Sequence, residues 1–137
     1  MSLIVHIRKR LHNFELISDF ETDGQLALLG ASGSGKSMTL KCIAGIEKPD
    51  SGYIELNGRV LYDSSKHINI QPQKRNVGYL FQNYALFLNM TVKKNILVAM
   101  KAENKTEKLN YLLDEFYIRD IQDKYPGEIS GGQQQRV

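Results

Sequence analysis

The chain has 137 residues, of which 42% are hydrophobic and 24% are charged. This length allows one domain with a hydrophobic core, and this composition excludes a disordered or fibrous chain. The net charge of +3, from 18 basic and 15 acidic residues, is too small to indicate a nucleic acid partner, so we expect none.

The single cysteine, Cys42, excludes a disulfide within the chain and favours a reducing compartment. Its neighbours Leu40, Ile43 and Ala44 predict that its thiol is buried in the core. No apolar stretch reaches the roughly 20 residues that span a bilayer. We therefore expect a soluble protein that reaches a membrane only through a partner.

The first third of the chain is typical of β-strands. Residues 3–8 and 14–20 are apolar and β-prone with polar residues interleaved, and we expect Phe14 to belong to the core. The short apolar run 25–29 follows the turn signal Asp23-Gly24. A continuous run of this length predicts a strand buried on both faces.

The pattern becomes helical from Lys36, with Gly45 near the end of the helix and Pro49 beyond it. Asn57-Gly58 then lies between two β-prone runs, which predicts a tight hairpin. Residues 64–75 are expected to form a polar loop.

The second half begins with residues 77–81, another candidate for a buried strand, which leads to Gln82. Thr91 is expected to cap a helix over residues 92–100. Thr106 is expected to cap a second helix, of which one face carries the apolar residues Leu109, Leu112, Leu113, Phe116 and Tyr117.

The most informative motif lies between the run 25–29 and the helix that starts at Lys36. It fits the phosphate-binding pattern G-x-x-x-x-G-K-[ST] at every position, with Gly30, Ala31, Ser32, Gly33, Ser34, Gly35, Lys36 and Ser37. Glycines let consecutive N–H groups point at one anion, and the helix start adds partial positive charge. Lys36 supplies a cation for the β- and γ-phosphates, and the Ser37 hydroxyl is suited to bind Mg²⁺.

Two further motifs give the chain a resemblance to the ATP-binding cassette (ABC) ATPases. Residues 77–87 resemble the segment around the glutamine loop of that family. Its signature motif is matched by Ser130, Gly131, Gly132 and Gln133. The resemblance implies an α/β fold, in which a nucleotide-binding core sheet carries an antiparallel β subdomain and a helical subdomain. We expect residues 1–85 to form the core and the β subdomain, and residues 86–137 the helical subdomain.

The resemblance also implies a function: ATP with Mg²⁺ as ligands, and ATP hydrolysis by the intact protein that drives solute import. Gln82 would reach the Mg²⁺ and the attacking water, so that Lys36 and Gln82 are the expected catalytic residues. The site at 130–133 would grip the γ-phosphate of ATP bound to a second copy. The expected partners are therefore a second ABC subunit and transmembrane permease subunits, on the cytoplasmic face of the cell membrane.

The motif region between residues 57 and 86 looks most like importers for oxyanions, molybdate above all. Two alternatives belong to other classes. One is a non-transport ABC ATPase acting in repair or translation, which would carry inserted segments that we do not find between these motifs. The other is a nucleotide-binding fragment without turnover.

The sequence departs from the family pattern in two places. Where most cassettes stack the adenine on an aromatic residue, this chain has Leu11 and His12. The metal-holding aspartate, catalytic glutamate and switch histidine of the family follow the signature, and the printed chain ends before them. Asp114-Glu115 imitates the missing pair but lies on a predicted helix before the signature. We therefore expect the 137-residue chain alone to be inactive.

Overall fold

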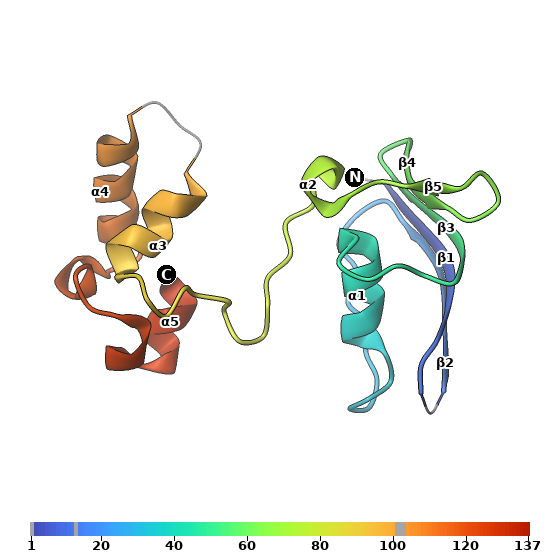
Figure 1. The fold of residues 1–137 in the computed structure, drawn as a ribbon, viewed down its shortest axis with the longest axis horizontal. Coiled ribbons are helices and arrows are strands. Elements are labelled where there is room, and N and C mark those ends of the chain that lie inside the picture. Colours follow the sequence, from blue (N-terminus) through green and yellow to red (C-terminus); the bar gives the residue numbers. More distant parts are fainter. Residues whose placement is uncertain (1, 13, 101–103) are drawn as a thin grey trace. The chain divides into compact units, whose positions relative to one another are not determined.

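A computed structural model describes residues 2–12, 14–100 and 104–137 of the chain. It divides the chain into two compact units, Met1–Tyr79 and Leu80–Val137 (Figure 1).

The first unit is built on an antiparallel sheet of five strands in the order β2-β1-β3-β4-β5. The strands are β1 (Leu3–Arg10), β2 (Glu15–Thr22), β3 (Ser51–Leu56), β4 (Arg59–Asp63) and β5 (Ile68–Asn69). In β1 the buried Val5 and Ile7 alternate with more exposed residues, which is the period expected of a sheet with one covered face.

The hairpin predicted from Asn57-Gly58 joins β3 and β4. Both residues have positive φ, 51° at Asn57 and 76° at Gly58. Turns of this kind match the twist of the flanking strands, and few residues other than Asn and Gly adopt them. The prediction of a hairpin here is confirmed.

Helix α1 (Lys36–Ala44) packs against the covered face of the sheet, where the core of the unit lies (Figure 1). The helix begins and ends as predicted: Gly35 precedes it, and Gly45 ends it with φ of 80°. Cys42 is completely buried in this core, as expected.

Two expected buried strands do not form. Residues 25–29 and 77–81 have no strand pairing, and their side chains are largely exposed, Leu29 at 92% and Leu80 at 81%. A strand buried on both faces needs hydrogen-bonded neighbours on either side, and the described residues place none beside these runs. Phe14 was also expected in the core, and its side chain is instead 41% exposed.

The expected polar loop at 64–75 contains two short elements, β5 and helix α2 (Pro72–Arg75). Its last residue, Arg75, is almost completely buried.

The second unit is helical. Its elements are α3 (Val92–Ala99), α4 (Lys105–Glu115), η1 (Arg119–Ile121), η2 (Pro126–Glu128) and α5 (Gly131–Arg136). Thr91 caps α3 as predicted, because its side chain accepts a hydrogen bond from the amide of Lys94. Asn104, not Thr106, stands at the start of α4.

The core of this unit consists of Val92 and Ile96 of α3, Leu109 and Leu113 of α4, and Ile118, Ile121 and Ile129. Leu109 and Leu113 face it as predicted. Phe116 and Tyr117 do not: their side chains are 45% and 81% exposed. The helix ends at Glu115, so the helical spacing no longer directs these two residues to the buried face.

Among the described residues, no helix combines the length and the apolar character needed to cross a bilayer.

Candidate nucleotide-binding site

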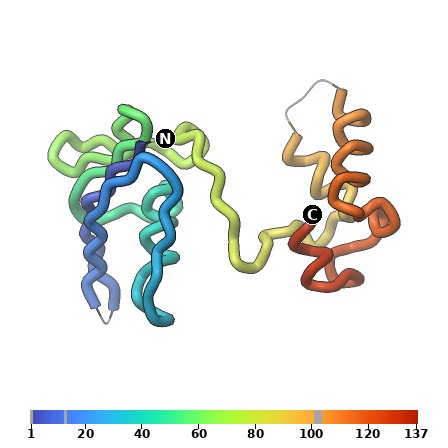
Figure 2. The backbone as a smooth tube through the Cα atoms, turned by 180° about the vertical axis from the view of Figure 1, so that it is seen from behind, coloured from blue at the N-terminus to red at the C-terminus, as the bar shows by residue number. Residues whose placement is uncertain are grey.

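The phosphate-loop motif forms a turn that enters α1 directly, and Figure 2 shows how the chain runs from β2 through this loop into the helix. Three of its glycines have positive φ: 156° at Gly30, 82° at Gly33 and 91° at Gly35. Gly35 is the cap residue of α1, and no side chain caps the helix start. The first-turn N–H groups therefore have no side-chain acceptor, which is the arrangement that favours an anion at this end.

The ammonium group of Lys36 lies within the loop. Lys36 Nζ donates to the carbonyl oxygens of Gly30 and Ala31, both at 2.7 Å, and to Ser34 Oγ at 3.3 Å. These partners are two carbonyl groups and one hydroxyl group, which are neutral. The positive charge of Lys36 is therefore available to attract an anion near the loop. The loop thus holds a positive charge among neutral groups.

Two of the glycines, Gly30 and Gly35, also have close neighbours where a Cβ would be. A Cβ added to Gly30 would lie 2.9 Å from Ser34 Oγ, and one added to Gly35 would lie 2.5 Å from Leu16 Cδ1. Backbone with positive φ further disfavours other residues here. A side chain at Gly30 or Gly35 would therefore require a strained backbone and a shift of Ser34 or Leu16.

A pair of hydroxyl groups fastens α1 to β2 just behind the loop. Ser18 Oγ and Thr39 Oγ1 are 2.7 Å apart and both residues are buried. Thr39 Oγ1 also donates to the Gly35 carbonyl at 3.2 Å. The sequence motif does not include Thr39, although its position four residues after Gly35 puts it within reach of that carbonyl.

A cavity of about 300 Å³ lies beside the loop, between it and β2. Its lining includes Gly30, Ser34 and Lys36 from the loop, together with residues of β2 and Thr39. The hollow places polar groups of the loop at an open surface that a small ligand can reach.

The residues expected to contact the base lie at the turn between β1 and β2. Leu11 is half-buried and His12 is exposed. Phe14, which was not among the expected base contacts, lies beside the loop: a Cβ on Gly35 would be 3.6 Å from Phe14 Cε2. Phe14 is therefore an exposed aromatic residue beside the loop, and the sequence analysis did not identify it as a candidate for base binding.

Ser37 is the second residue of α1 and is exposed, so its hydroxyl is accessible beside Lys36. Within the described ranges, no three His, Cys, Asp or Glu side chains gather as a metal site. Mg²⁺ usually keeps several waters and binds through one or two protein groups plus substrate phosphates, so a single hydroxyl here fits that ion when phosphates accompany it.

The second unit carries the other motifs. Ser130 is the cap residue of α5: its Oγ accepts from the amide of Gln133 at 3.3 Å, and Gln133 Oε1 accepts from the amide of Ser130 at 2.9 Å. This reciprocal pair is a capping box, and it explains why Gly131 and Gly132 begin a helix.

Gln82 lies in a turn at the start of the second unit and is exposed. Tyr84 and Ala85, which follow it, have positive φ of 58° and 50°. The structure thus places Lys36 and Ser37 in one unit, and Gln82 with residues 130–133 in the other.

Asp114 and Glu115 occupy the last turn of α4, as the sequence predicted for this imitation of a catalytic pair. Both are exposed, and Asp114 forms two hydrogen bonds with the guanidinium of Arg119, at 2.5 and 2.7 Å. The Arg119 hydrogen bond lowers the pKa of Asp114. Asp114 is therefore an exposed carboxylate whose partner is the guanidinium of Arg119.

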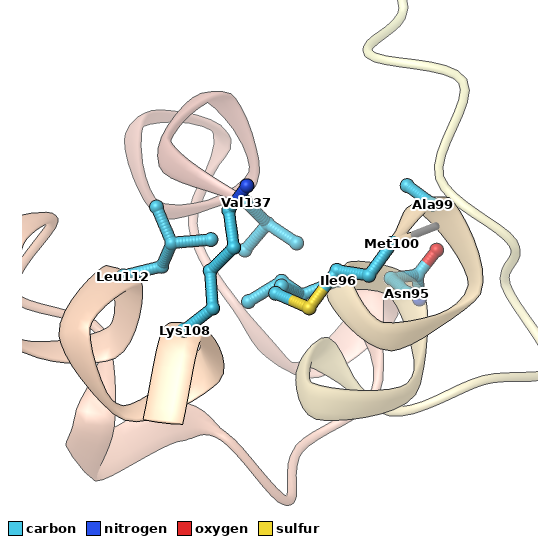
Figure 3. Close-up of a pocket in the computed structure, with 7 residues that line it drawn as sticks. All are labelled: Asn95, Ile96, Ala99, Met100, Lys108, Leu112 and Val137. Atoms are coloured by element: carbon cyan, nitrogen blue, oxygen red, sulfur yellow. The ribbon is translucent and has the colours of Figure 1, made fainter. Parts of the chain in front are cut away.

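A larger cavity, of about 590 Å³, lies between α3 and α4 (Figure 3). Ile96, Met100 and Leu112 give it an apolar lining, with Lys108 at its edge and Val137 nearby. Its lining residues include no glycine-rich loop, unlike those of the cavity beside Gly30 and Lys36.

Residues 14–137 match the family described as ABC transporter. The chain belongs to this family. The match covers nearly the whole sequence and both groups of motifs, so the ABC ATPase domain inferred from the phosphate loop and the signature is confirmed.

Curated relatives of this ABC chain include a sulfate/thiosulfate import ATP-binding protein of Synechocystis, 40% identical over all of this chain and 40% of the relative. A sulfate/thiosulfate import protein of Chlorella vulgaris, described as probable, is 38% identical over 98% of this chain and 58% of its own. A molybdenum import ATP-binding protein of Paramagnetospirillum magneticum is 35% identical over 98% of this chain and 38% of its own. The chain thus spans less than two thirds of the length of these relatives.

Among solved structures, the ATP-binding cassette MJ0796, in a dimeric post-hydrolysis state bound to ADP and Pi, is similar with a TM-score of 0.69. It is 22% identical over 99% of this chain and 66% of its own. A likeness at this identity concerns the fold, and it confirms the α/β class of an ABC ATPase domain.

Proposed function

We propose that this chain is the nucleotide-binding part of an ABC importer ATPase, which binds ATP with Mg²⁺ through residues Gly30–Ser37. The observation that carries the proposal is the Lys36 ammonium, held among neutral groups of a glycine loop at the start of α1. The amides of the loop and of the first helical turn would bind the phosphate oxygens, with Lys36 against the β- and γ-phosphates.

The Ser37 hydroxyl would be a ligand of Mg²⁺, which when bound neutralises charge on the phosphates. Gln82 would orient the attacking water, since its exposed carboxamide can accept a hydrogen bond from it. Leu11 and His12 remain proposed base contacts. Phe14 joins them, because its ring is exposed beside Gly35 and can stack on a base.

Ser130, Gly131, Gly132 and Gln133 are proposed to meet the γ-phosphate of ATP on a second copy of the protein. The intact protein would then act as a homodimer beneath transmembrane permease subunits, on the cytoplasmic side of the membrane. The import names of the relatives and the dimeric state of the solved cassette support this assembly.

The proposed solute is a tetrahedral oxyanion. The relatives include importers named for sulfate and thiosulfate and one named for molybdenum, so molybdate is not favoured over sulfate. Uptake of labelled sulfate and labelled molybdate into cells that carry the intact protein with its permease would separate the two. Uptake of neither would contradict the oxyanion proposal and leave nucleotide binding untouched.

Nucleotide binding itself is tested by titrating Mg-ATP into the protein and into Lys36→Ala, with Lys48→Ala as the control for loss of an exposed lysine. We expect Lys36→Ala to weaken binding by roughly 10²-fold, because hydrogen bonds to charged groups are worth about 1.5–3 kcal/mol each. Equal affinity of all three proteins would contradict the assignment of the loop.

A further inference from the structure

Arg75 is a buried cation with no carboxylate among its hydrogen-bond partners. Arg75 is the last residue of α2, and it is only 1% exposed. Nη1 donates to the carbonyl oxygens of Cys42 and Ile43, both at 2.8 Å. Nε donates to the Ile70 carbonyl at 2.7 Å, and Nη2 donates to Asn69 Oδ1 at 2.9 Å.

Two of these acceptors belong to the last turn of α1. Carbonyl groups at the end of a helix lack intrahelical donors and carry partial negative charge, which a cation stabilises. Arg75 supplies both the donors and the charge, so it caps the C-terminal end of the helix from a distant part of the chain. Burial lowers the pKa of Arg75, yet a guanidinium remains protonated in proteins.

The chain leaves space for this contact at Gly45. A Cβ on Gly45 would lie 2.5 Å from Arg75 Nε and 2.7 Å from its Cζ. The residue that ends α1 is therefore a glycine for two reasons, its φ of 80° and the guanidinium beside it.

The opposite end of α1 is the candidate phosphate site. The helix has nine residues, and at about 1.5 Å per residue it is roughly 13 Å long. Few of its side chains are buried, namely Thr39, Cys42, Ile43 and Ala44. Polar contacts therefore matter to its position: Thr39 to Ser18 near the start, and Arg75 at the end.

We infer that Arg75 is a positioning residue for the nucleotide site, which acts by holding the far end of α1 and so fixes where the helix presents Lys36 and Ser37. This inference rests on the proposed ATP binding. Arg75 is also the residue that directly precedes the segment leading to Gln82, in which Asn76 has φ of 56° and Val77 packs against the core of the first unit.

The test compares Arg75→Met, which keeps the length of the side chain but removes its charge and donors, with Arg75→Lys, which keeps the charge. Leu61→Ala is the matched control, since Leu61 is fully buried in the same core and makes none of these hydrogen bonds. Melting temperatures are followed by circular dichroism, and the Kd for Mg-ATP is measured well below every melting transition, where all the proteins are folded.

We expect Arg75→Met to weaken Mg-ATP binding by roughly tenfold, because a shift of α1 would weaken hydrogen bonds to the charged phosphates, which are worth about 1.5–3 kcal/mol each. Arg75→Lys should fall between it and the unchanged protein. Leu61→Ala should lower the melting temperature without changing the Kd.

An unchanged Kd in folded Arg75→Met, with a melting temperature lowered as in Leu61→Ala, would overturn the inference and leave Arg75 as a purely stabilising residue. If Arg75→Met does not fold, Arg75→Lys decides: a weaker Kd supports the inference, and an unchanged one contradicts it. Absence of Mg-ATP binding by the unchanged protein would contradict the proposed function instead, so the two failures are distinct.

Discussion

The carboxamide of Asn95 pairs with both backbone groups of Phe87: Oδ1 accepts from its amide at 2.8 Å, and Nδ2 donates to its carbonyl at 3.1 Å. The same Nδ2 lies 3.1 Å from the carbonyl oxygens of Met90 and Thr91. Asn95 is buried in α3. One side chain thereby fixes the backbone of the loop that lies between Gln82 and α3.

Replacing this residue by Asn95→Leu should destabilise the protein by about 2–4 kcal/mol, because it removes three hydrogen bonds to the backbone of Phe87 and Met90, each worth about 0.5–1.5 kcal/mol. Urea denaturation monitored by circular dichroism measures the loss. Asn89→Ala, at an exposed position of the same loop, is the control and should have little effect. Equal midpoints for the two variants would mean that water replaces the Asn95 hydrogen bonds without cost.

Gly45 and Gly58 offer a matched pair, since both have positive φ but only Gly45 has a neighbour where a Cβ would be. Gly58→Ala should cost roughly 1–2 kcal/mol for the backbone conformation alone. Gly45→Ala should cost a further 1–3 kcal/mol or so, because it presses on the Arg75 guanidinium. Thermal denaturation of both variants compares them directly, and a smaller loss at Gly45 would show that Arg75 moves aside easily.

The His6 ring lies on the exposed face of the sheet, with Nδ1 2.7 Å from Asp19 Oδ1 and Nε2 3.3 Å from Glu21 Oε1. The hydrogen bond to Asp19 raises the pKa of His6 above its ordinary 6.5, and burial opposes the change. A raised pKa in the folded state means that this contribution to stability is complete below about pH 6.5 and disappears as the pH rises through the higher value.

NMR titration of the His6 ring in the unchanged protein and in Asp19→Asn measures this effect. We expect the substitution to lower the pKa of His6, with only a small change in stability because both side chains are largely solvated. The same pKa in both proteins would contradict the role of Asp19.

Glu115 should play no part in ATP turnover by the intact protein, because it lies on the exposed face of α4 beside the ion pair of Asp114 and Arg119. Glu115→Gln should therefore leave the rate of phosphate release unchanged, whereas Lys36→Ala should lower it strongly. Loss of turnover in Glu115→Gln would show that this carboxylate does act at the site.

The sequence was most informative where local rules determine structure. Positive φ at Asn57 and Gly58, the cap at Thr91 and the glycines around α1 follow from residue type within a few positions. The ABC family was likewise recognisable, because the phosphate loop and the signature are local motifs.

Prediction failed where the outcome depends on distant partners. The apolar run at 25–29 indicates a buried strand only if other strands flank it, and Phe14 indicates a core residue only if something covers it. Arg75 and Asn95 could not be identified either, because their partners at Cys42, Ile43 and Phe87 become neighbours only through folding. No pattern in the neighbouring sequence indicates that a polar residue such as Arg75 or Asn95 will be buried.

The central claim, that Gly30–Ser37 binds Mg-ATP, is tested most directly by amide hydrogen exchange with and without the nucleotide. Backbone N–H groups that bind phosphate should exchange more slowly, so we predict that Mg-ATP protects peptides covering residues 30–39, and that Lys36→Ala abolishes this protection. Unchanged exchange across residues 30–39 at saturating Mg-ATP, or protection confined to other parts of the chain, would contradict the account.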